Sequence, residues 1–344
     1  MSKHRILLVG CGGIADAWLT PAQTFFQEQG KIVALVDLRP EAAKAKAEKY
    51  QMSDTWIGSC LKSGIEEAKP DVVFDCTIPE GHYSVTKIAL EAGCHVLGEK
   101  PVASESSQAM ELIKLADEHE RVFSVIQNRR YLGSVRRVIE LIQSGLIGDV
   151  HTINADFFMA AHFDGFRRDM PHVLLADMAI HTFDSARYLS GKNATSVFCH
   201  EFNPDGAWCN YGGSAHALFK MEDGVVFNYR GSWAADGHHT DWNSAWRIIG
   251  TKGTILWDGD SKIEAEFLPG DRDLSQFFQD YKKETYEPLK LEEYREGHAG
   301  LIGDFFQAIE TNTNPLTVAS DNVHSFMMVE RAIESAEKCR EIDF

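Results

Sequence analysis

Cysteine is sparse in this sequence, and its spacing forms no familiar pattern. Seven cysteines are spread over 344 residues, and no two of them form a Cys-x-x-Cys pair. An odd number without that spacing argues against a disulfide framework and against a cysteine-based zinc site. The segment 233–242 holds two histidines and two aspartates, but a polar loop between strands explains it better than a metal site. We therefore expect a reducing compartment and no bound metal.

Basic residues are also in short supply. Lysine and arginine together number 34, against 51 aspartates and glutamates, which gives a formal net charge of −17. An acidic surface repels phosphate backbones, so the composition predicts no nucleic-acid partner. One phosphorylated cofactor remains compatible, because a local group of backbone N–H donors can bind it.

Long apolar runs are missing as well. No stretch approaches the length needed to span a bilayer, and the apolar run near the start is too short for a signal peptide. The sequence therefore predicts a cytoplasmic protein without membrane contact. Its length suits two domains better than one.

The first third of the chain alternates strand-like and helix-like segments. Repeated β-α-β units of this kind imply a parallel sheet flanked by helices. We therefore predict an α/β Rossmann domain over residues 1–127. The predicted strands are 5–9, 31–37, 71–76, 94–98 and 122–126, and the predicted helices are 13–29, 40–50, 82–92 and 104–120.

After residue 127 the pattern changes to longer, strand-rich segments. We predict one domain over 128–344, of the α+β class, with a mostly antiparallel, open-faced sheet. Glycine between 246–250 and 254–257 predicts a hairpin there. The other predicted strands are 150–159, 194–201, 213–220 and 224–232, and the predicted helices are 134–145, 174–189, 298–311 and 321–339.

The first motif that indicates a function is a glycine-rich run between the first predicted strand and the first predicted helix. The run Gly10-Cys11-Gly12-Gly13-Ile14-Ala15 fits the pattern G-x-G-x-x-A. The first glycine permits a tight turn, the second lets the backbone approach a pyrophosphate, and the small alanine lets helix and strand pack closely. The helix N-terminus would then face the phosphates. The alternative is a glycine-rich turn without a cofactor.

The acidic residue that this motif requires lies at the end of the second predicted strand. Asp37 can bind the ribose hydroxyls of NAD and would repel the 2′-phosphate of NADP. Arg39, two residues later, could offset that repulsion, although a solvated charge before a helix explains it better. We predict NAD as the cofactor, with NADP possible.

Two later strands end in runs that should face the same cleft. Thr77-Ile78-Pro79 and Glu99-Lys100-Pro101 each follow a predicted parallel strand, and ligands bind beyond the carboxyl ends of such strands. The ammonium of Lys100 could hydrogen-bond an alcohol oxygen and share its proton. The alternative is an ordinary surface lysine.

A second group of polar residues lies on the predicted helix 174–189. Asp177, His181 and Asp184 are spaced i, i+4 and i+7, which places them on one face of an amphipathic helix. A carboxylate beside an imidazole can orient it for proton transfer. A structural His–Asp pair would leave the same pattern.

Taken together, these runs resemble the glucose–fructose oxidoreductase/inositol dehydrogenase family over nearly the whole chain. The resemblance rests on GCGGIA, Asp37, TIPEGHYSVTKIALEAGCHVLGEKP, DMAIHTFD, IIGTKGTILWDGD and GHAGLIGDFFQAIE. It implies that Lys100, Asp177 and His181 are catalytic and that His82 lies near the nicotinamide ribose. The predicted cofactor-binding residues are Gly10, Gly12, Gly13, Ile14, Ala15, Asp37, Leu38, Arg39, Thr77, Pro79, His82, Glu99, Lys100 and Asn128.

This chain departs from the family pattern just before Asp177. Relatives often have a run of glycines there, whereas this sequence has PHVLLAD, so the shape of the substrate pocket cannot be carried over. Besides His181, we predict substrate contacts from His172 and from one of the neighbouring arginines, Arg168 or Arg167.

The resemblance implies hydride transfer between NAD(P) and a secondary alcohol of a sugar, cyclitol or related polyol. Two alternatives are an oxidoreductase that never releases its cofactor and a non-catalytic, nucleotide-sensing protein. The resemblance also implies that the second domain binds substrate and assembles a homo-oligomer, a dimer or a tetramer. Tryptophans at 208, 233, 242, 246 and 257 could line the packing face of its sheet or form an ordinary core.

Overall fold

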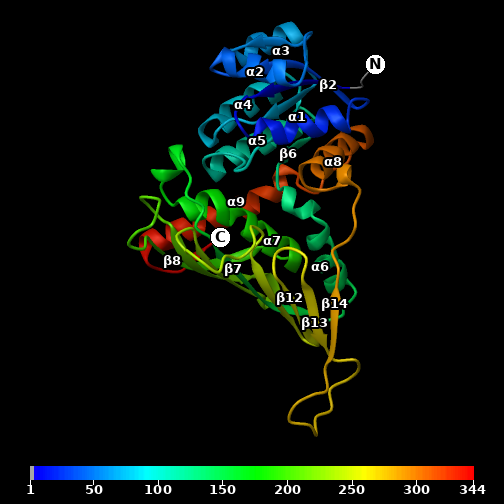
Figure 1. Ribbon diagram of the computed structural model, residues 1–344, viewed down its shortest axis with the longest axis vertical. Coiled ribbons are helices and arrows are strands. Elements are labelled where there is room, and N and C mark those ends of the chain that lie inside the picture. The colour runs from blue at the N-terminus through cyan, green and yellow to red at the C-terminus, as the bar shows by residue number, and fades with distance from the viewer. Residues whose placement is uncertain (1–3) are drawn as a thin grey trace. The chain divides into compact units, whose positions relative to one another are not determined.

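The computed structural model describes residues 4–344 and divides the chain into two compact units (Figure 1). The first unit contains the N-terminal part of the chain up to Tyr131 together with Leu291–Phe326. The second contains Leu132–Lys290 and Met327–Phe344. Within the described residues, every helix is too short or too polar to cross a membrane.

The first unit is built on a six-stranded parallel sheet in the order β3-β2-β1-β4-β5-β6. This is the strand order of a dinucleotide-binding fold, so the predicted Rossmann domain is confirmed. The central strands are buried on both faces, as their unbroken apolar runs require. The strands are β1 (His4–Val9), β2 (Gly30–Val36), β3 (Trp56–Gly58), β4 (Val72–Asp75), β5 (His95–Gly98) and β6 (Phe123–Val125), and the helices are α1 (Ala15–Thr24), α2 (Pro40–Lys49), α3 (Leu61–Ala68), α4 (Pro79–Glu91) and α5 (Ser106–Glu118).

A segment from near the end of the chain completes this unit, which differs from the predicted division after residue 127. Helix α8 (Gly297–Thr311) buries Phe305 and Phe306 in the same apolar core as β1 and β4. The ring of Phe74 lies 6.5 Å from that of Phe305, centroid to centroid. Because α8 supplies part of the core, 291–326 belongs with the first unit.

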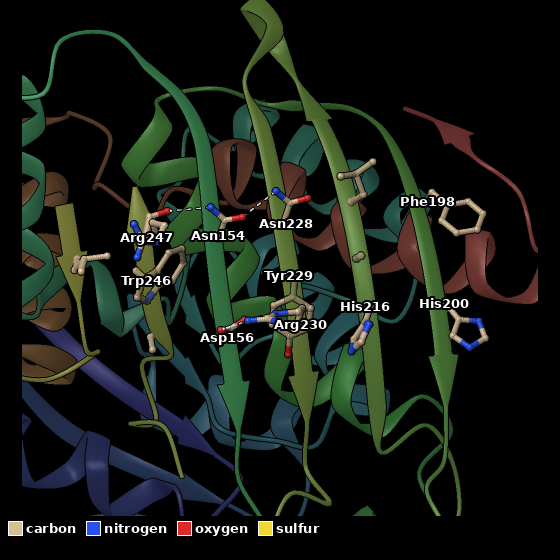
Figure 2. Close-up of a pocket in the computed structure, with 14 residues that line it drawn as sticks. Asn154, Asp156, Phe198, His200, His216, Asn228, Tyr229, Arg230, Trp246 and Arg247 are labelled. Atoms are coloured by element: carbon tan, nitrogen blue, oxygen red, sulfur yellow. Dashed lines mark hydrogen bonds and ion pairs between the residues drawn. The ribbon is translucent and has the colours of Figure 1, made fainter. Parts of the chain in front are cut away.

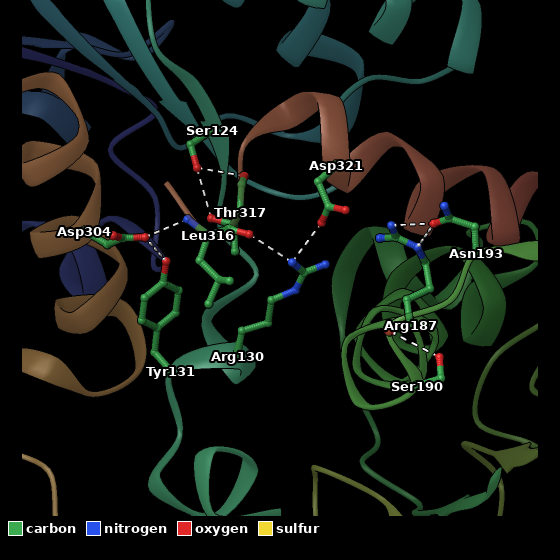
Figure 3. Close-up of polar contacts among 10 residues, drawn as sticks. All are labelled: Ser124, Arg130, Tyr131, Arg187, Ser190, Asn193, Asp304, Leu316, Thr317 and Asp321. Atoms are coloured by element: carbon green, nitrogen blue, oxygen red, sulfur yellow. Dashed lines mark hydrogen bonds and ion pairs between the residues drawn. The ribbon is translucent and has the colours of Figure 1, made fainter. Parts of the chain in front are cut away.

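Polar contacts fasten the same segment to the 3-10 helix η1 (Asn128–Tyr131) (Figure 3). Arg130 Nη1 donates to the carbonyl of Leu316 at 2.9 Å and pairs with Asp321 Oδ2 at 2.8 Å. Asp304 Oδ2 accepts hydrogen bonds from the Tyr131 hydroxyl, at 2.5 Å, and from the Leu316 N–H, at 2.8 Å. The bonds made by Arg130 and Tyr131 connect residues more than 170 positions apart in sequence.

The second unit is built on a nine-stranded sheet in the order β14-β13-β12-β11-β7-β10-β9-β8-β15. Strand β10 pairs with β7 in parallel, and the other described pairs are antiparallel, which confirms the predicted α+β class. The predicted hairpin is the β11–β12 pair. The strands are β7 (Val150–Phe158), β8 (Ala194–Phe202), β9 (Ser214–Met221), β10 (Val226–Ser232), β11 (Ala245–Gly250), β12 (Gly253–Trp257), β13 (Ile263–Phe267), β14 (Lys282–Tyr286) and β15 (Ile342–Asp343).

Helices cover one face of this sheet. They are α6 (Gly133–Gln143), the π-helix η3 (Leu174–Ala179) and α7 (Ile180–Ser190), with the end of α9 (Ala319–Lys338). Alternate residues along each strand, such as Ile153 and Phe157, are buried beneath the helices. Trp233, Trp246 and Trp257 are also at most 3% exposed, so these three tryptophans are largely buried in the core.

Candidate functional site

The glycine turn after β1 has two kinds of glycine. Gly10 has φ +89°, and a Cβ there would lie 2.5 Å from the carbonyl oxygen of Cys76, so the fold itself requires this glycine. A Cβ at Gly12 or Gly13 would meet nothing within 4 Å. Internal packing therefore gives no reason for these two exposed glycines, whereas a phosphate resting on the backbone would. The turn fits the cofactor that the sequence predicts.

Asp37 is tied directly to this turn. Its Oδ2 accepts a hydrogen bond from the Cys11 N–H at 2.8 Å, and its Oδ1 accepts one from the Arg39 N–H at 2.9 Å. The guanidinium of Arg39 lies 3.8 Å from the carboxylate and is largely exposed, as is Leu38. The carboxylate is thus held beside the turn, where a ribose would lie next to the phosphates.

The loops that follow β4 and β5 are joined by His82. Its Nδ1 lies 2.6 Å from the carbonyl oxygen of Pro101, and its Nε2 lies 3.0 Å from that of Thr77. The side chain is only 2% exposed. His82 therefore has an internal partner for each ring nitrogen, and its place near the nicotinamide ribose stays a prediction.

Glu99 and Lys100 occupy the end of β5. Glu99 Oε1 accepts a hydrogen bond from Trp18 Nε1 at 2.9 Å, and burial raises the pKa of the Glu99 carboxyl. The Lys100 N–H donates to Glu99 Oε2 at 3.3 Å, and the peptide bond between Lys100 and Pro101 is cis. The hydrogen bond to Glu99 thus orients the backbone N–H of the predicted catalytic lysine.

Two polar residues of this unit escaped the sequence analysis. Asp75 is 1% exposed, and its Oδ1 accepts hydrogen bonds from the N–H and the hydroxyl of Thr77, so it orders the loop after β4. His298 lies 3.4 Å from the amide nitrogen of Asn128, and burial lowers its pKa to about 4. An acid at the end of the apolar run 71–76 is a signal that could have identified Asp75; nothing local identifies His298.

In the second unit, Asp177 is bound by Arg167. Arg167 Nε donates to Asp177 Oδ2 at 2.6 Å, and Nη2 donates to Oδ1 at 3.4 Å. The guanidinium also lies over the rings of Phe163 and Phe166, 5.3 and 4.8 Å from their centroids. Arg168 is exposed. Arg167 therefore contacts Asp177, and the substrate contact predicted for Arg168 or Arg167 stays a prediction.

The helix that carries Asp177 and His181 differs from the predicted amphipathic helix. Its first part is the π-helix η3, which holds Asp177, and His181 follows on α7. Asp177 and His181 are both partly exposed, but Asp184 is only 1% exposed and α7 is buried on most sides. Of the three predicted residues, only Asp177 and His181 thus reach solvent, and the π turn changes the angle between them from that of an α-helix.

His172 lies between two carboxylates. Its Nδ1 is 2.6 Å from Glu201 Oε2, and its Nε2 is 3.5 Å from Glu337 Oε1. The hydrogen bond that the imidazole donates to Glu201 raises the pKa of His172. The predicted substrate contact is therefore held by internal partners on both nitrogens.

A hollow of about 770 Å³ lies on the open face of the nine-stranded sheet (Figure 2). Arg230 crosses it to pair with Asp156, and the Asn228 amide donates to Asn154 Oδ1 at 3.0 Å. None of the predicted site residues lines this hollow. Within the described residues 4–344, no group of three or more histidine, cysteine, aspartate or glutamate side chains is arranged to hold a metal ion.

Comparison with known proteins agrees with both units. Residues 4–127 match an oxidoreductase family with an NAD-binding Rossmann fold, and residues 135–256 match the GFO/IDH/MocA C-terminal domain. The chain belongs to this oxidoreductase family. The predicted resemblance, the predicted enzyme class and the prediction of an NAD-binding Rossmann domain are thereby confirmed.

Relatives of this oxidoreductase include sugar and cyclitol dehydrogenases. It is 29% identical to D-glucoside 3-dehydrogenase of Escherichia coli over 233 residues. The matched part is 65% of this chain and 66% of that protein, which is just under two thirds. It is 24% identical to inositol 2-dehydrogenase of Rhizobium meliloti over 321 residues, 91% of each chain. An oxidoreductase from Agrobacterium radiobacter, solved with NAD⁺, L-tartaric acid and magnesium, shares the fold with a TM-score of 0.86 at 19% identity, over 99% of this chain and 98% of that one.

Proposed function

We propose that this oxidoreductase transfers a hydride between NAD and a secondary alcohol of a sugar, cyclitol or related polyol. The observation that carries the proposal is the pair of open glycines, Gly12 and Gly13, beside an aspartate carboxylate tied to the same turn. Asp37 favours NAD over NADP because a second phosphate would lie against its charge. The names of the relatives support a small polyhydroxylated substrate.

The residues proposed to hold the nucleotide are those of the first unit. They are Gly10, Gly12, Gly13, Ile14, Ala15, Asp37, Leu38, Arg39, Thr77, Pro79, Glu99, Lys100 and Asn128, with His82 acting behind them on the Thr77 and Pro101 carbonyls. When bound, the nicotinamide ring supplies a hydride acceptor for alcohol oxidation.

The proposed catalytic residues are Lys100, Asp177 and His181. His181 accepts the proton of the substrate hydroxyl as its carbon is oxidised, and Lys100 donates a hydrogen bond to the oxygen that becomes the carbonyl. Asp177 orients His181. Arg167 adds a positive charge and two hydrogen bonds at Asp177, which fix the carboxylate in one orientation.

Two measurements test this proposal in turn. Calorimetry on nucleotide-free protein should show binding of NAD⁺ more tightly than NADP⁺, and a panel of sugars, inositols and sugar acids should include one that reduces the bound nucleotide. Binding of neither dinucleotide would sink the proposal. Protein that purifies with nucleotide and exchanges hydride between two substrates would indicate a cofactor-retaining enzyme, and binding without turnover would indicate a sensor.

A further inference from the structure

The imidazole of His82 lies between two backbone carbonyls and is almost fully buried. Its Nδ1 is 2.6 Å from the Pro101 oxygen, and its Nε2 is 3.0 Å from the Thr77 oxygen. A carbonyl oxygen only accepts hydrogen bonds, and a neutral imidazole carries one N–H. A neutral His82 would therefore turn a lone pair toward one of the two oxygens, at a position that is 2% exposed and shielded from bulk water. The imidazolium has two N–H donors and satisfies both carbonyls.

Two carboxylates of the same region supply the opposite charge that a buried imidazolium requires. Asp75 ends β4 and is 1% exposed, and Glu99 directly follows β5. Burial raises the pKa of both carboxyls, and a positive charge on His82 acts on each in the opposite direction. Lys100 acts on Glu99 in that same direction. A charged His82 thus offsets part of the cost of burying these two carboxylates.

The other charged groups on the helices that pack against α4 are exposed or paired with one another. On α3 the charged side chains lie at exposed positions, and on α5 Glu111 pairs with Lys87 of α4 itself. The thiol of Cys76, next to Asp75 in the chain, stays neutral because burial raises its pKa. The charges that act on His82 therefore come from the ends of β4 and β5.

We propose that His82 is an imidazolium whose two N–H groups hold the loop after β5 against the loop after β4. Pro101 directly follows Lys100, so the bond from Nδ1 to its carbonyl supports the backbone that carries the proposed catalytic ammonium. His82 is a positioning residue in this arrangement, because it acts through backbone carbonyls. Its effect on Lys100 rests on the proposed function, whereas its charge does not.

The first test reads the charge of His82 in the nucleotide-free wild-type protein. Histidine labelled with ¹³C and ¹⁵N is followed by long-range ¹H–¹⁵N correlation at about pH 8, where an unperturbed imidazole is neutral. Through-bond correlations to the His82 backbone assign its signals, so no variant has to fold. Both ring nitrogens should have the chemical shift of an N–H nitrogen.

His95 of the same unit is the matched control. Its Nδ1 accepts a hydrogen bond from the Val122 N–H at 2.9 Å, and burial lowers the pKa of the imidazole to about 4. At the same pH its Nδ1 should therefore have the chemical shift of an unprotonated nitrogen. An unprotonated nitrogen on His82 overturns the proposal, whether or not the protein binds a nucleotide.

A second test removes the opposite charge. Asp75→Asn should make His82 lose its second proton at a pH at least about one unit lower than in the wild type, because a nearby carboxylate favours the imidazolium. Asp117→Asn, at an exposed position of α5, should leave that pH unchanged. Circular dichroism checks that both variants are folded. The same pH in Asp75→Asn and the wild type would overturn the charge pair on which the proposal rests.

A third test measures the effect on Lys100. His82→Phe keeps a buried ring but has no N–H donor, so stopped-flow reduction of bound NAD⁺ by a polyol of the panel should slow at least about tenfold. His151→Phe, at an exposed position of β7, should leave the rate unchanged. Equal rates in these two variants would remove His82 from the positioning of Lys100. A wild type that reduces no NAD⁺ would contradict the proposed function, and the charge of His82 would still be decided by the first test.

Discussion

At the scale of single residues, we expect one glycine of the turn to be needed for stability and another for cofactor binding. Gly10→Ala should lower the free energy of unfolding by at least about 2 kcal/mol, because its backbone has positive φ and its Cβ would meet Cys76. Gly12→Ala should change that free energy by less than about 0.5 kcal/mol, since its Cβ meets nothing. It should nevertheless weaken NAD⁺ binding at least about tenfold.

Urea unfolding and calorimetry on both variants check this pair. If Gly12→Ala binds NAD⁺ as the wild type does, the phosphates do not rest on this part of the turn. If Gly10→Ala is as stable as the wild type, the close approach to Cys76 does not constrain the loop.

Lys100 gives the sharpest test of the chemistry. Lys100→Met keeps much of the side-chain volume but cannot donate to the substrate oxygen, so hydride transfer should slow by about 10²- to 10⁴-fold. Stopped-flow reduction of bound NAD⁺ measures the step directly. Lys114→Met, at an exposed position on α5, is the matched control and should leave the rate unchanged. A Lys100→Met rate equal to that of the control would remove this lysine from the mechanism.

His172 and Glu201 should make stability depend on pH. Their hydrogen bond raises the pKa of the imidazole in the folded protein above its ordinary 6.5, so the folded state binds the proton more tightly. The stabilisation is fully present below pH 6.5 and is lost as pH rises through the raised folded pKa. The difference in unfolding free energy between wild type and Glu201→Gln should therefore shrink by about 1 kcal/mol from pH 6 to pH 9. A pH-independent difference would contradict this assignment.

Residue-level predictions succeed where the partners are close in sequence. The turn and Asp37 follow from one strand–helix–strand unit, so the sequence motif suffices to place them together. The hydrogen bond of His172 to Glu201 joins residues 29 positions apart, and no local sequence pattern predicts it. The contact of Arg167 with Asp177 spans ten positions and an irregular loop, so the sequence did not predict this pair.

At the scale of elements, long periodic segments were predictable and short ones were not. The sequence predicts five of the six Rossmann strands, but it misses β3 and α3, which have three and eight residues. It also misses β13 and β14, whose charged residues weaken the strand pattern. The π-helix η3 has no sequence signature that apolar spacing reveals.

Helix α8 offers an element-scale prediction. Phe305 is fully buried, so Phe305→Ala should lower the free energy of unfolding by about 3–5 kcal/mol. Gln307→Ala, at an exposed position of the same helix, should change it by less than about 0.5 kcal/mol. Chemical denaturation followed by tryptophan fluorescence measures both. Equal stabilities for the two variants would show that α8 is not part of the first unit's core.

At the scale of the whole molecule, the division into units was the hardest feature to predict. The apolar residues of α8 pack against β1 and β4 across more than 200 positions, and periodicity shows only that α8 is a helix. A fragment ending at residue 127 should therefore expose apolar surface and bind the dye ANS. A chain that joins residues 1–131 directly to 291–326 through a flexible linker should fold and bind NAD⁺. An equally compact 1–127 fragment would contradict this.

The assignment of 291–326 to the first unit has a consequence for how the protein is made. Ribosomes release chains from the N-terminus at about 5–20 residues per second, so the roughly 200 residues between 127 and 326 take about 10–40 s to appear. During that interval the strands of the first unit have been made, but helix α8, which completes their apolar core, has not. The nascent chain thus leaves part of its first apolar core uncovered until α8 has been made.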